Sequence, residues 1–575
     1  MADYLKYMYN FKLSSLKKYL GNNLMDTLLE WSPNGEMLLT RQRIIKMIDS
    51  LYGTNILKNK DVRMDLLLSM KSKDIFKIRD ECLSGKEKRE TDPIVLAKSI
   101  AGKAWGKNRI SLYLLKLWDV NENIFDKDIE QDAEIVNQIK AGERFYELLD
   151  YQYYIKQRVL GILNSGNFLE RLLIHMPTGT GKTKTTMHII VNYIEFTMRK
   201  KGLVIWVAHT TELLQQAYDT FVEVWTHLGE DEINVYKIWG KNTIKNTKNH
   251  LDGVAFCGLS KLMSITENTP ELLRRLELDC RLIVFDEAHK AAATETRKVI
   301  ENFMRMKGEM KNRALVGLSA TPGRTTKDSY DNNLLMHMFG GKLIDINVDV
   351  LNQINMGSLK ALNVIAEENI IKYFQERRIL SRLNVEKLVY KTEFTDAELK
   401  LLNVDLAIMG YDDFTKSQLK ILAKNKNRNL KIMMRLRELY NANIPTIVFS
   451  CSVDHAKILS AMLTLEEIPN SLVIGEMNSL DRKKAIDTFK DRQSNVNIII
   501  NYEVLTTGFD SKNIKCVFIT RPTQSIVLYS QMIGRGLRGP LMGGNEECLL
   551  IDMEDNIKAF NNESAFLHFN EYWKY

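Results

Sequence analysis

The residues that could do chemistry in this chain first gather in the stretch HMPTGTGKTKTT, residues 175–186, where two glycines and two lysines lie among five threonines. The apolar run RLLI precedes the stretch, and MHIIVNYIEF, which follows it, has helical spacing. At a strand-to-helix junction, glycine lets backbone N–H groups point at an anion, and the helix N-terminus adds a favourable dipole. The pattern predicts a loop that wraps phosphate, and an ordinary glycine turn is the alternative.

This loop supplies most of the expected nucleotide contacts. Lys182 is placed to reach the β- and γ-phosphates of a nucleoside triphosphate, and the Thr183 hydroxyl is placed to bind Mg²⁺. The general pattern G-x-x-x-x-G-K-[S/T] requires glycine where this chain has Met176, so the match to it is incomplete. The loop residues that we expect to bind nucleotide are Thr178, Gly179, Thr180, Gly181, Lys182 and Thr183.

Two adjacent carboxylates follow another apolar run, in RLIVFDEAH at residues 281–289. Burying acidic side chains at the end of a strand is costly unless a cation or hydrogen bonds satisfy them. A magnesium ion held by Asp286 would do so, and Glu287 could then orient and deprotonate an attacking water. An exposed acid pair that caps the next helix is the alternative. Because the phosphate loop and the acids occur in this order and context, they favour hydrolysis of a nucleotide.

Short apolar runs, each followed by a turn and an amphipathic helix, position these motifs. Continuous rather than alternating apolar strands, separated by helices, are typical of a parallel sheet covered on both faces. The first series is RLLIHM, LVIWVAH, VAFCGL, RLIVFDEAH and RALVGLSAT. The second series is IPTIVFSCS, NSLVIG, VNIIINYEV, IKCVFITRP and ECLLIDM. We therefore expect an α/β protein with two parallel sheets in tandem.

The region in front of the first series has a helical pattern instead. Ile44, Ile48 and Leu51 recur at helical spacing, and Thr40 before RQRIIKMI is placed as a helix N-cap. The domains that we expect are a helical domain at 1–145, a first lobe at 146–345, a second lobe at 346–560 with a helical insertion around 370–430, and a tail at 561–575.

Composition limits the partners, the metal sites and the cellular location that we expect for the protein. The net charge of +8 permits a polyanionic partner but does not require one, because solvated lysine faces also produce such a charge. The six cysteines include no C-x-x-C pair, which argues against a zinc ribbon, an iron–sulfur cluster and a disulfide framework. No run approaches the ~18 apolar residues that a membrane span needs. We therefore expect a cytoplasmic protein without a membrane segment.

PTGTGKT followed by DEAH resembles the superfamily 2 helicases, specifically their DEAH-box branch. The loop of that family has proline two residues before the first glycine, which accounts for Met176. The resemblance covers about residues 150–560 and implies two tandem RecA-like lobes with ATP and Mg²⁺ bound where they meet. YQYYIKQ, residues 151–157, is similar to the motif whose glutamine reads adenine, which implies that role for Gln152.

Further motifs follow in the order of that family. VAHTTELLQQA resembles the first strand-gripping motif, LTTGFD the motif that contacts nucleic acid and nucleotide, and QMIGRGLRGP the motif Q-x-x-G-R-x-x-R. GLSATPGR contains the S-A-T motif that couples hydrolysis to domain movement. The resemblance implies catalytic roles for Gln531, Arg535 and Arg538, coupling roles for His289, Ser319 and Thr321, nucleotide contacts for Gly508 and Asp510, and nucleic-acid contacts for Thr210, Thr211, Arg324, Thr506 and Thr507.

The expected function is that of an ATP-dependent helicase or translocase. If the lobes close over ATP, the late arginines can neutralise charge on the transferring phosphoryl, and such a finger contributes ~10³–10⁵ in rate. Contact with nucleic acid should be mostly to the phosphate backbone. Resemblance to helicases of restriction and bacterial defence systems favours DNA and suggests a role in phage defence. An RNA helicase and an ATP-timed nucleic-acid sensor that recruits an effector are the alternatives.

Three regions have more than one interpretation. Residues 1–145 could bind a partner protein, load DNA or brace the first lobe. The runs KIWGKNTIKNTKNH at 237–250 and TKSQLKILAKNKNRNLKIMMRLR at 415–437 contain no acid. Each run could be a nucleic-acid track or a solvated helix face, and in the second run the apolar residues at helical spacing leave the two hypotheses evenly balanced.

Overall fold

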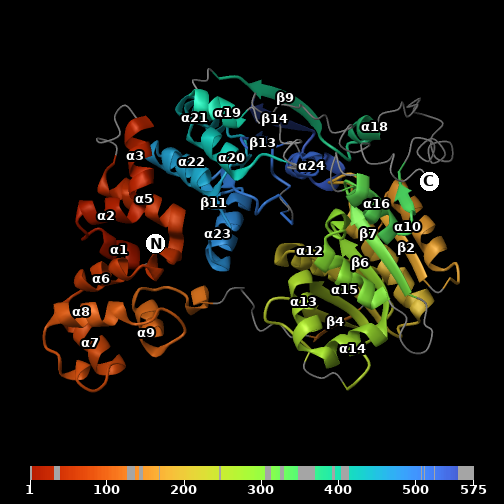
Figure 1. The fold of residues 1–575 in the computed structure, drawn as a ribbon, viewed down its shortest axis with the longest axis horizontal. Helices are drawn as coiled ribbons and strands as arrows, with labels where there is room; N and C mark the ends of the chain where they lie inside the picture. The colour runs from red at the N-terminus through yellow and green to blue at the C-terminus, as the bar shows by residue number, and fades with distance from the viewer. Residues whose placement is uncertain are drawn as a thin grey trace.

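The computed structural model consists of a helical domain and two sheet-based lobes (Figure 1). None of the helices within the described residues is long and apolar enough to cross a membrane. The structure describes residues 3–31, 39–125, 136–140, 147–167, 169–244, 248–304, 313–323, 329–346, 370–390, 395–402, 413–506, 508–509, 512–523 and 525–553.

The N-terminal domain is helical, as its apolar spacing predicts. Ile44, Ile48 and Leu51 are buried on one face of α5, and the Thr40 side chain caps that helix by accepting a hydrogen bond from the Arg43 N–H. The helices of this domain are α1 (Asp3–Met8), α2 (Leu13–Leu20), α3 (Asn22–Trp31), α5 (Arg41–Tyr52), η1 (Gly53–Lys58), α6 (Lys60–Leu68), α7 (Ser72–Cys82), η2 (Glu87–Arg89), α8 (Pro93–Gly102), α9 (Arg109–Leu117) and η3 (Glu122–Phe125).

The first lobe is built on an eight-stranded sheet in the order β1-β4-β5-β3-β6-β7-β2-β8. Neighbouring strands are parallel except β1 and β4, which are antiparallel. The strands are β1 (Val136–Ile139), β2 (Leu169–His175), β3 (Leu203–Ala208), β4 (Ile233–Ile238), β5 (Gly253–Gly258), β6 (Cys280–Asp286), β7 (Arg313–Ser319) and β8 (Leu343–Asp345). The helices are α10 (Asp150–Leu163), α11 (Lys182–Asn192), η4 (Tyr193–Met198), α12 (Thr211–Leu228), α13 (Leu259–Asn268), α14 (Pro270–Asp279), η5 (Ala288–Lys290), α15 (Thr294–Met304) and α16 (Ser329–Met338).

The second lobe is built on a six-stranded parallel sheet in the order β11-β12-β10-β13-β14-β9. Its strands are β9 (Arg382–Leu388), β10 (Thr446–Phe449), β11 (Ser471–Val473), β12 (Ile498–Asn501), β13 (Cys516–Ile519) and β14 (Glu547–Met553). Its helices are α18 (Ile370–Glu376), α19 (Asp396–Leu402), α20 (Lys416–Lys424), α21 (Lys426–Asn441), α22 (Val453–Leu465), α23 (Ser479–Lys490), α24 (Ile526–Ile533) and η6 (Pro540–Met542).

All ten apolar runs form strands, so the predicted α/β fold with two tandem parallel-sheet lobes is confirmed. Four strands were not predicted, namely β1, β4, β8 and β9. β1 lies within the range predicted as helical, 1–145, but it pairs with β4, so the first sheet begins before residue 145. β9 interrupts the predicted helical insertion around 370–430, because its backbone pairs with β14 at the edge of the second sheet.

The helical domain packs on the second lobe. Helices α3 and α5 lie against α22 (Figure 1), and one continuous apolar core contains residues of both the domain and the lobe. The Asp481 carboxylate on α23 accepts hydrogen bonds from the backbone N–H and the hydroxyl of Thr54, both at 2.9 Å. Arg43 pairs with Glu467 across the same boundary at 3.1 Å. The hypothesis that residues 1–145 brace the first lobe is therefore wrong for the packed helices, because the second lobe carries them.

We expect Asp481→Ala to loosen the helical domain from the second lobe. The substitution removes the two hydrogen bonds from Thr54 and a third from Asn478, each contributing roughly 0.5–1.5 kcal/mol net. Amide hydrogen exchange in residues 53–58 should become ~10-fold faster or more, while exchange in β10 should not change. Asp487→Ala, at an exposed acid on the same helix, is the matched control. Equal exchange in the two variants would contradict the docking role.

Candidate nucleotide site between the lobes

The phosphate loop lies at the predicted junction, between the end of β2 at His175 and the start of α11 at Lys182. Gly179 and Gly181 have φ angles of +88° and +84°, a region in which only glycine is free of steric strain. These two residues turn the chain sharply into α11, whose first N–H groups have no partner within the helix. The loop therefore has the backbone geometry of an anion-binding site.

The lysine of the loop lies close to the paired acids. Lys182 Nζ donates hydrogen bonds to the carbonyl oxygens of Met176 at 3.0 Å and Pro177 at 3.2 Å. Burial lowers the pKa of Lys182 to about 8, while the carboxylates of Glu287 and Asp286 act in the opposite direction. The loop after β2 and the acids after β6 thus share one electrostatic environment, as expected for the carboxyl ends of strands in one parallel sheet.

The two acids have opposite pKa shifts. Burial, together with the charge of Glu287, raises the pKa of Asp286 to about 7 against the charge of Lys182. Burial also acts to raise the pKa of Glu287, but the charges of His289, Lys182 and Lys290 outweigh it and hold that pKa below its ordinary value. Neighbouring carboxyls whose pKa values are pushed apart are typical of a catalytic site.

The donor set at Asp286 fits a magnesium ion. Its Oδ1 accepts a hydrogen bond from the Glu287 N–H at 3.0 Å, and ionising so buried a carboxyl is costly unless a cation neutralises it. Mg²⁺ is commonly bound by one or two carboxylates together with phosphate oxygens and water. Glu287 has a φ of +55°, and such left-handed backbone costs a non-glycine residue roughly 1–3 kcal/mol and clusters at active sites.

His289 connects the acids to the second lobe. Its Nδ1 lies 3.4 Å from Glu287 Oε2 and 3.5 Å from Ser319 Oγ, and its Nε2 lies 3.5 Å from Nε2 of Gln531. Ser319 Oγ also donates a hydrogen bond to the Thr321 carbonyl at 2.6 Å. One buried imidazole therefore contacts the second acid, the S-A-T motif and the Q-x-x-G-R-x-x-R motif, which is the arrangement that a coupling role requires.

Gln152 holds the phosphate loop. Its Nε2 donates to the Thr180 carbonyl at 2.9 Å, its Oε1 accepts from the Leu149 N–H at 3.0 Å, and its side chain is buried. The Tyr151 hydroxyl donates to the same Thr180 carbonyl at 2.7 Å. To read adenine, as the sequence predicts, Gln152 would have to exchange these bonds. The contact with the loop carbonyl was not predicted.

The second lobe contacts the phosphate loop directly. A methyl group added at Gly534 would overlap the Thr178 side chain, so glycine is needed for the approach of the lobes. A methyl group added at Gly179 would lie 3.6 Å from Arg538 Cγ. Arg535 is also close, because its charge, after burial, contributes to the low pKa of the loop lysine. The late arginines therefore lie at the boundary that contains the phosphate loop and the acids.

A second contact between the lobes was not predicted. Arg482 on α23 forms an ion pair with Glu212 on α12 at 3.1 Å, and both side chains are partly buried. Gly508, predicted to contact nucleotide, lies against Glu212 and Leu213 at the start of α12. No local sequence signal marks Arg482, because its partner is 270 residues away in the chain.

The predicted nucleic-acid residues that the structure describes make local hydrogen bonds. Thr210 caps α12, since its Oγ1 accepts a hydrogen bond from a backbone N–H three residues along the helix. The Thr211 hydroxyl lies 3.3 Å from Glu212 Oε2, and the buried Thr506 hydroxyl donates to the Glu503 carbonyl at 2.6 Å. Three predicted residues lie outside the described part of the chain, namely Arg324, Thr507 and Asp510.

The two acid-free runs are not continuous basic surfaces. The first begins in β4 and ends at His250, whose Nδ1 lies 2.7 Å from Asp279, the last residue of α14. In the second run, acids from other elements pair with the arginines. Arg435 binds Glu386 of β9, and Arg437 binds Glu466. These pairs favour the interpretation of the second run as helices with one packed and one solvated face over its interpretation as a nucleic-acid track.

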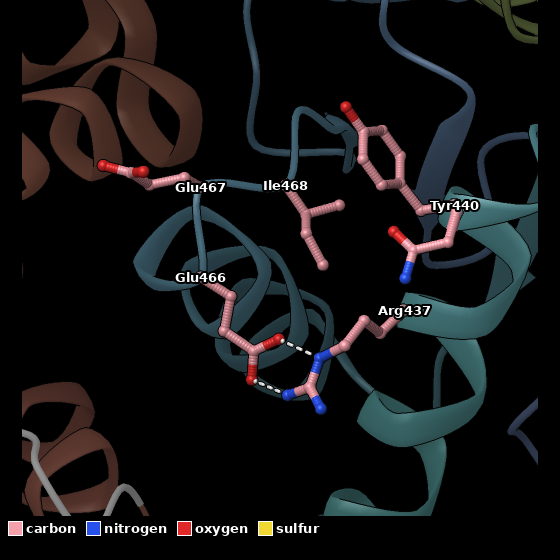
Figure 2. Close-up of a pocket in the computed structure, with 6 residues that line it drawn as sticks. Arg437, Tyr440, Glu466, Glu467 and Ile468 are labelled. Atoms are coloured by element: carbon pink, nitrogen blue, oxygen red, sulfur yellow. Dashed lines mark hydrogen bonds and ion pairs between the residues drawn. The ribbon is translucent and has the colours of Figure 1, made fainter.

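A surface cavity of about 370 Å³ lies away from the nucleotide site, at the amino edge of the second sheet (Figure 2). The C-terminal end of α21 and the turn after α22 line it, and these segments lead into β10 and β11. Arg437 and Glu466 form a two-point hydrogen-bonded pair there, with distances of 2.9 and 2.6 Å. Their charges neutralise each other, so the cavity lacks the uncompensated charge of the interlobe site.

Comparisons with known proteins agree with this geometry. Residues 138–324 match the family described as type III restriction enzyme, res subunit, and residues 428–539 match the helicase conserved C-terminal domain. The chain is 25% identical over 434 residues to the putative ATP-dependent helicase IRC3 of Saccharomyces cerevisiae, covering 73% of this chain and 53% of that protein. It is 22% identical over 433 residues to the endonuclease subunit of the type I restriction enzyme EcoAI of Escherichia coli. That match covers 73% of this chain and 47% of the Escherichia coli protein.

The matched ranges contain both halves of the site. The phosphate loop and the acids lie in the first range, and Arg535 and Arg538 lie in the second. The chain belongs to the superfamily 2 helicases. The fold also matches a solved structure of Saccharomyces cerevisiae Dbp5 bound to RNA and ADP BeF3, at 16% identity and a TM-score of 0.45. The match covers 73% of this chain and 87% of the Dbp5 chain. The helicase spans about half the length of the curated relatives it matches.

We expect Asp286→Asn to stabilise the helicase at alkaline pH. Asp286 ionises with a pKa near 3.8 in the unfolded chain but about 7 in the fold, so the fold binds the extra proton and loses stability as the pH rises between these values. The asparagine variant escapes this loss. Its thermal unfolding midpoint should exceed that of the wild type by several degrees at pH 8 and equal it near pH 4.

The matched control for this measurement is Asp487→Asn, at an exposed acid on α23. It should leave the unfolding midpoint unchanged across the same pH range. A midpoint for Asp286→Asn below that of the wild type at pH 8 would show that burial of the Asp286 charge is already compensated in the fold.

The ion pair between Arg482 and Glu212 should support closure of the lobes. Partly buried pairs couple by ~0.5–1 kcal/mol, so Arg482→Ala and Glu212→Ala should each lower nucleic-acid-stimulated ATP turnover ~2–5-fold. The double variant should be no slower than either single variant, and exchanging the two charges should restore most of the rate. Arg492→Ala, at an exposed position after α23, is the control. Additive losses would argue that the two residues act independently.

Proposed function

We propose that this helicase hydrolyses ATP with Mg²⁺ in the interlobe site and uses the movement of the lobes to travel along nucleic acid. The observation that supports this proposal is that His289 contacts Glu287 and Ser319 on the first lobe and Gln531 on the second. Closely packed buried groups have few alternative arrangements, so a shift of the second acid alters the contact across the lobe boundary.

Each group has a role within this site. Lys182 binds the β- and γ-phosphate oxygens in place of its loop carbonyls, and Thr183 and Asp286 hold Mg²⁺. When bound, the ion neutralises charge on the phosphates. Glu287 orients the attacking water and accepts its proton. The two arginines of the Q-x-x-G-R-x-x-R motif neutralise charge that develops on the transferring phosphoryl, which makes hydrolysis depend on closure.

Nucleic acid is held across the two lobes. Thr210 and Thr211 at the start of α12, with Arg324, contact the phosphate backbone from the first lobe, and Thr506 and Thr507 contact it from the second. The ion pair of Arg482 supports this assignment, because it joins α23 to the same end of α12. A motor of this kind binds the backbone and loses affinity as salt rises.

DNA is the substrate that we favour, with a role in restriction or phage defence in the bacterial cytoplasm. The match to the type III restriction enzyme family supports this, as does the similarity to the EcoAI endonuclease subunit. The sequence DEAH, ending at His289, supports a place in the DEAH-box branch. A partner protein would supply any nuclease or effector activity, and residues 1–145 are the candidate attachment region.

Two rival functions use the same ATP site. An RNA helicase is one, since the ATP-dependent RNA helicase MAK5 of Kluyveromyces lactis is 22% identical over 383 residues. An ATP-timed sensor that clamps nucleic acid and recruits an effector is the other. Nothing in the contacts of Lys182 or Glu287 separates these functions, because each needs the same hydrolysis.

The deciding experiment measures ATP turnover with single-stranded DNA, duplex DNA and RNA side by side, together with strand displacement. We expect DNA to stimulate turnover and strands to separate. Glu287→Gln should still bind ATP but turn over ~10²–10⁴-fold more slowly, since it removes the general base. Lys182→Ala should lose nucleotide binding as well. Glu271→Gln, at an exposed acid on α14, is the control and should keep the full rate.

Each contrary outcome identifies a rival. Stronger stimulation by RNA would favour the RNA helicase, and stimulated turnover without strand separation or movement would favour the sensor. Wild-type turnover by Glu287→Gln would exclude Glu287 as the base.

A further inference from the structure

One part of the helical domain carries an excess of positive charge. Residues 58–116 contain 15 lysines and arginines against 8 aspartates and glutamates, a net charge of +7, whereas the whole chain carries +8. This segment forms α6, α7, α8 and α9. The lobes also contain a strongly basic segment, the acid-free run 415–437 with eight lysines and arginines, but acids of other elements pair with its Arg435 and Arg437.

Most of this charge lies on the surface. Lys71, Lys73 and Lys77 are exposed at the start and along one side of α7. By contrast, Arg63 is buried and donates to backbone carbonyls, and Lys103 pairs with Glu87 at 2.8 Å, so these two have structural roles. The exposed basic residues of the neighbouring helices α8 and α9 include Lys98, Arg109 and Lys116.

Helix stability does not account for these positions. The N-terminal end of a helix is its positive end, so acids are favoured in the first turn and cations are unfavourable there. Nevertheless Lys71 and Lys73 lie at the start of α7, and Lys60 and Arg109 are the first residues of α6 and α9. The first turns of α6 and α7 also contain one acid each, Asp61 and Asp74. The charges of these side chains are repelled by the positive ends of their own helices. An external anion bound there would offset this repulsion.

The basic helices point away from the docked face of the domain. Contacts with the second lobe come from α3, α5, η1 and η3, whereas α7 and α8 lie at the end of the domain remote from α22 (Figure 1). The hydrogen bonds between Thr54 and Asp481 attach the domain to α23, the helix that also carries Arg482. A ligand held by α7 would therefore be held by the second lobe.

We propose that the exposed lysines of α7, Lys71, Lys73 and Lys77, form a second nucleic-acid site, which binds the phosphate backbone of the strand or duplex on which the motor acts. The proposal rests on the proposed function. Lysine is depleted at protein–protein interfaces, where arginine and aromatic residues are enriched, so this lysine-rich surface fits phosphates better than an acidic protein. Binding here is independent of sequence and sensitive to salt.

The test uses the full chain with Lys71→Glu, Lys73→Glu and Lys77→Glu combined. Its Kd for labelled single strands and duplexes, of DNA and of RNA, is measured over a range of salt concentrations. Each lost phosphate contact lowers the slope of log K against log salt by ~0.9 on duplex and ~0.7 on single strands. We expect the duplex slope to fall by ~2 and affinity at low salt to weaken ~10-fold or more.

The matched control reverses the same number of charges in the near-neutral part of the same domain, with Lys12→Glu, Lys17→Glu and Lys46→Glu combined. Basal ATP turnover without nucleic acid should equal that of the wild type in both triple variants, which shows that the lobes are folded. A triple glutamine variant at the α7 lysines should reproduce the loss of slope without the added negative charge.

The outcomes are distinct. A loss of slope confined to the α7 variants supports the site. Equal weakening by the control would show a general effect of net charge, and unchanged binding would leave an acidic protein as the partner of this surface; either result overturns the proposal. Failure of the wild type to bind any nucleic acid would instead overturn the proposed function.

Discussion

Burial of opposite charges at the carboxyl edge of the first sheet is the constraint on which the site depends. The apolar strands that bring Asp286 and Lys182 together also exclude the water that would solvate them. The charges compensate one another only in part, since the pKa of Asp286 remains high and that of Lys182 remains low. The first lobe therefore leaves buried charge only partly compensated at this edge of the sheet.

This incompleteness explains why the lobes meet where they do. Gly534 approaches Thr178 on the phosphate loop, and His289 reaches Gln531, so the second lobe contacts residues that lie near the buried charges in the chain. The ion pair of Arg482 lies at a separate place, the start of α12. Two contacts of this kind define a relative orientation of the lobes, which one contact alone would leave free to rotate.

The sequence predicted the strands that are buried on both faces and missed strands that are partly polar or lie at an edge. All residues of β3, β5 and β7 are buried, so their apolar runs are continuous. β9 lies at the edge of its sheet, exposes Val385, and carries Glu386, which pairs with Arg435 of α21, so it lacks that signal. β4 contains Asn234 and Lys237, and β8 has three residues. Strands of this kind are specified by their neighbours rather than by their own composition.

Within the site, the motif residues were predictable because their chemistry depends on local spacing, whereas the contacts between them were not. His289 meets Gln531 across 242 residues of chain, and Thr54 meets Asp481 across 427. No pattern in one sequence connects such positions. Gln152 shows the same limit at shorter range, since the motif marks the residue but not the loop carbonyl that its amide binds.

The helical domain covers apolar surface of the second lobe. One apolar core runs from Ile44 and Ile48 of α5 to Leu459 of α22 and Val448 of β10. The second sheet has strands of only three to seven residues, and one side of it is buried partly by these helices. Separated from the domain, that face would expose a contiguous apolar patch of the kind that soluble monomers rarely tolerate. The helical domain and the second lobe are therefore one packing unit, and any force on the domain acts on the lobe that carries Arg535 and Arg538.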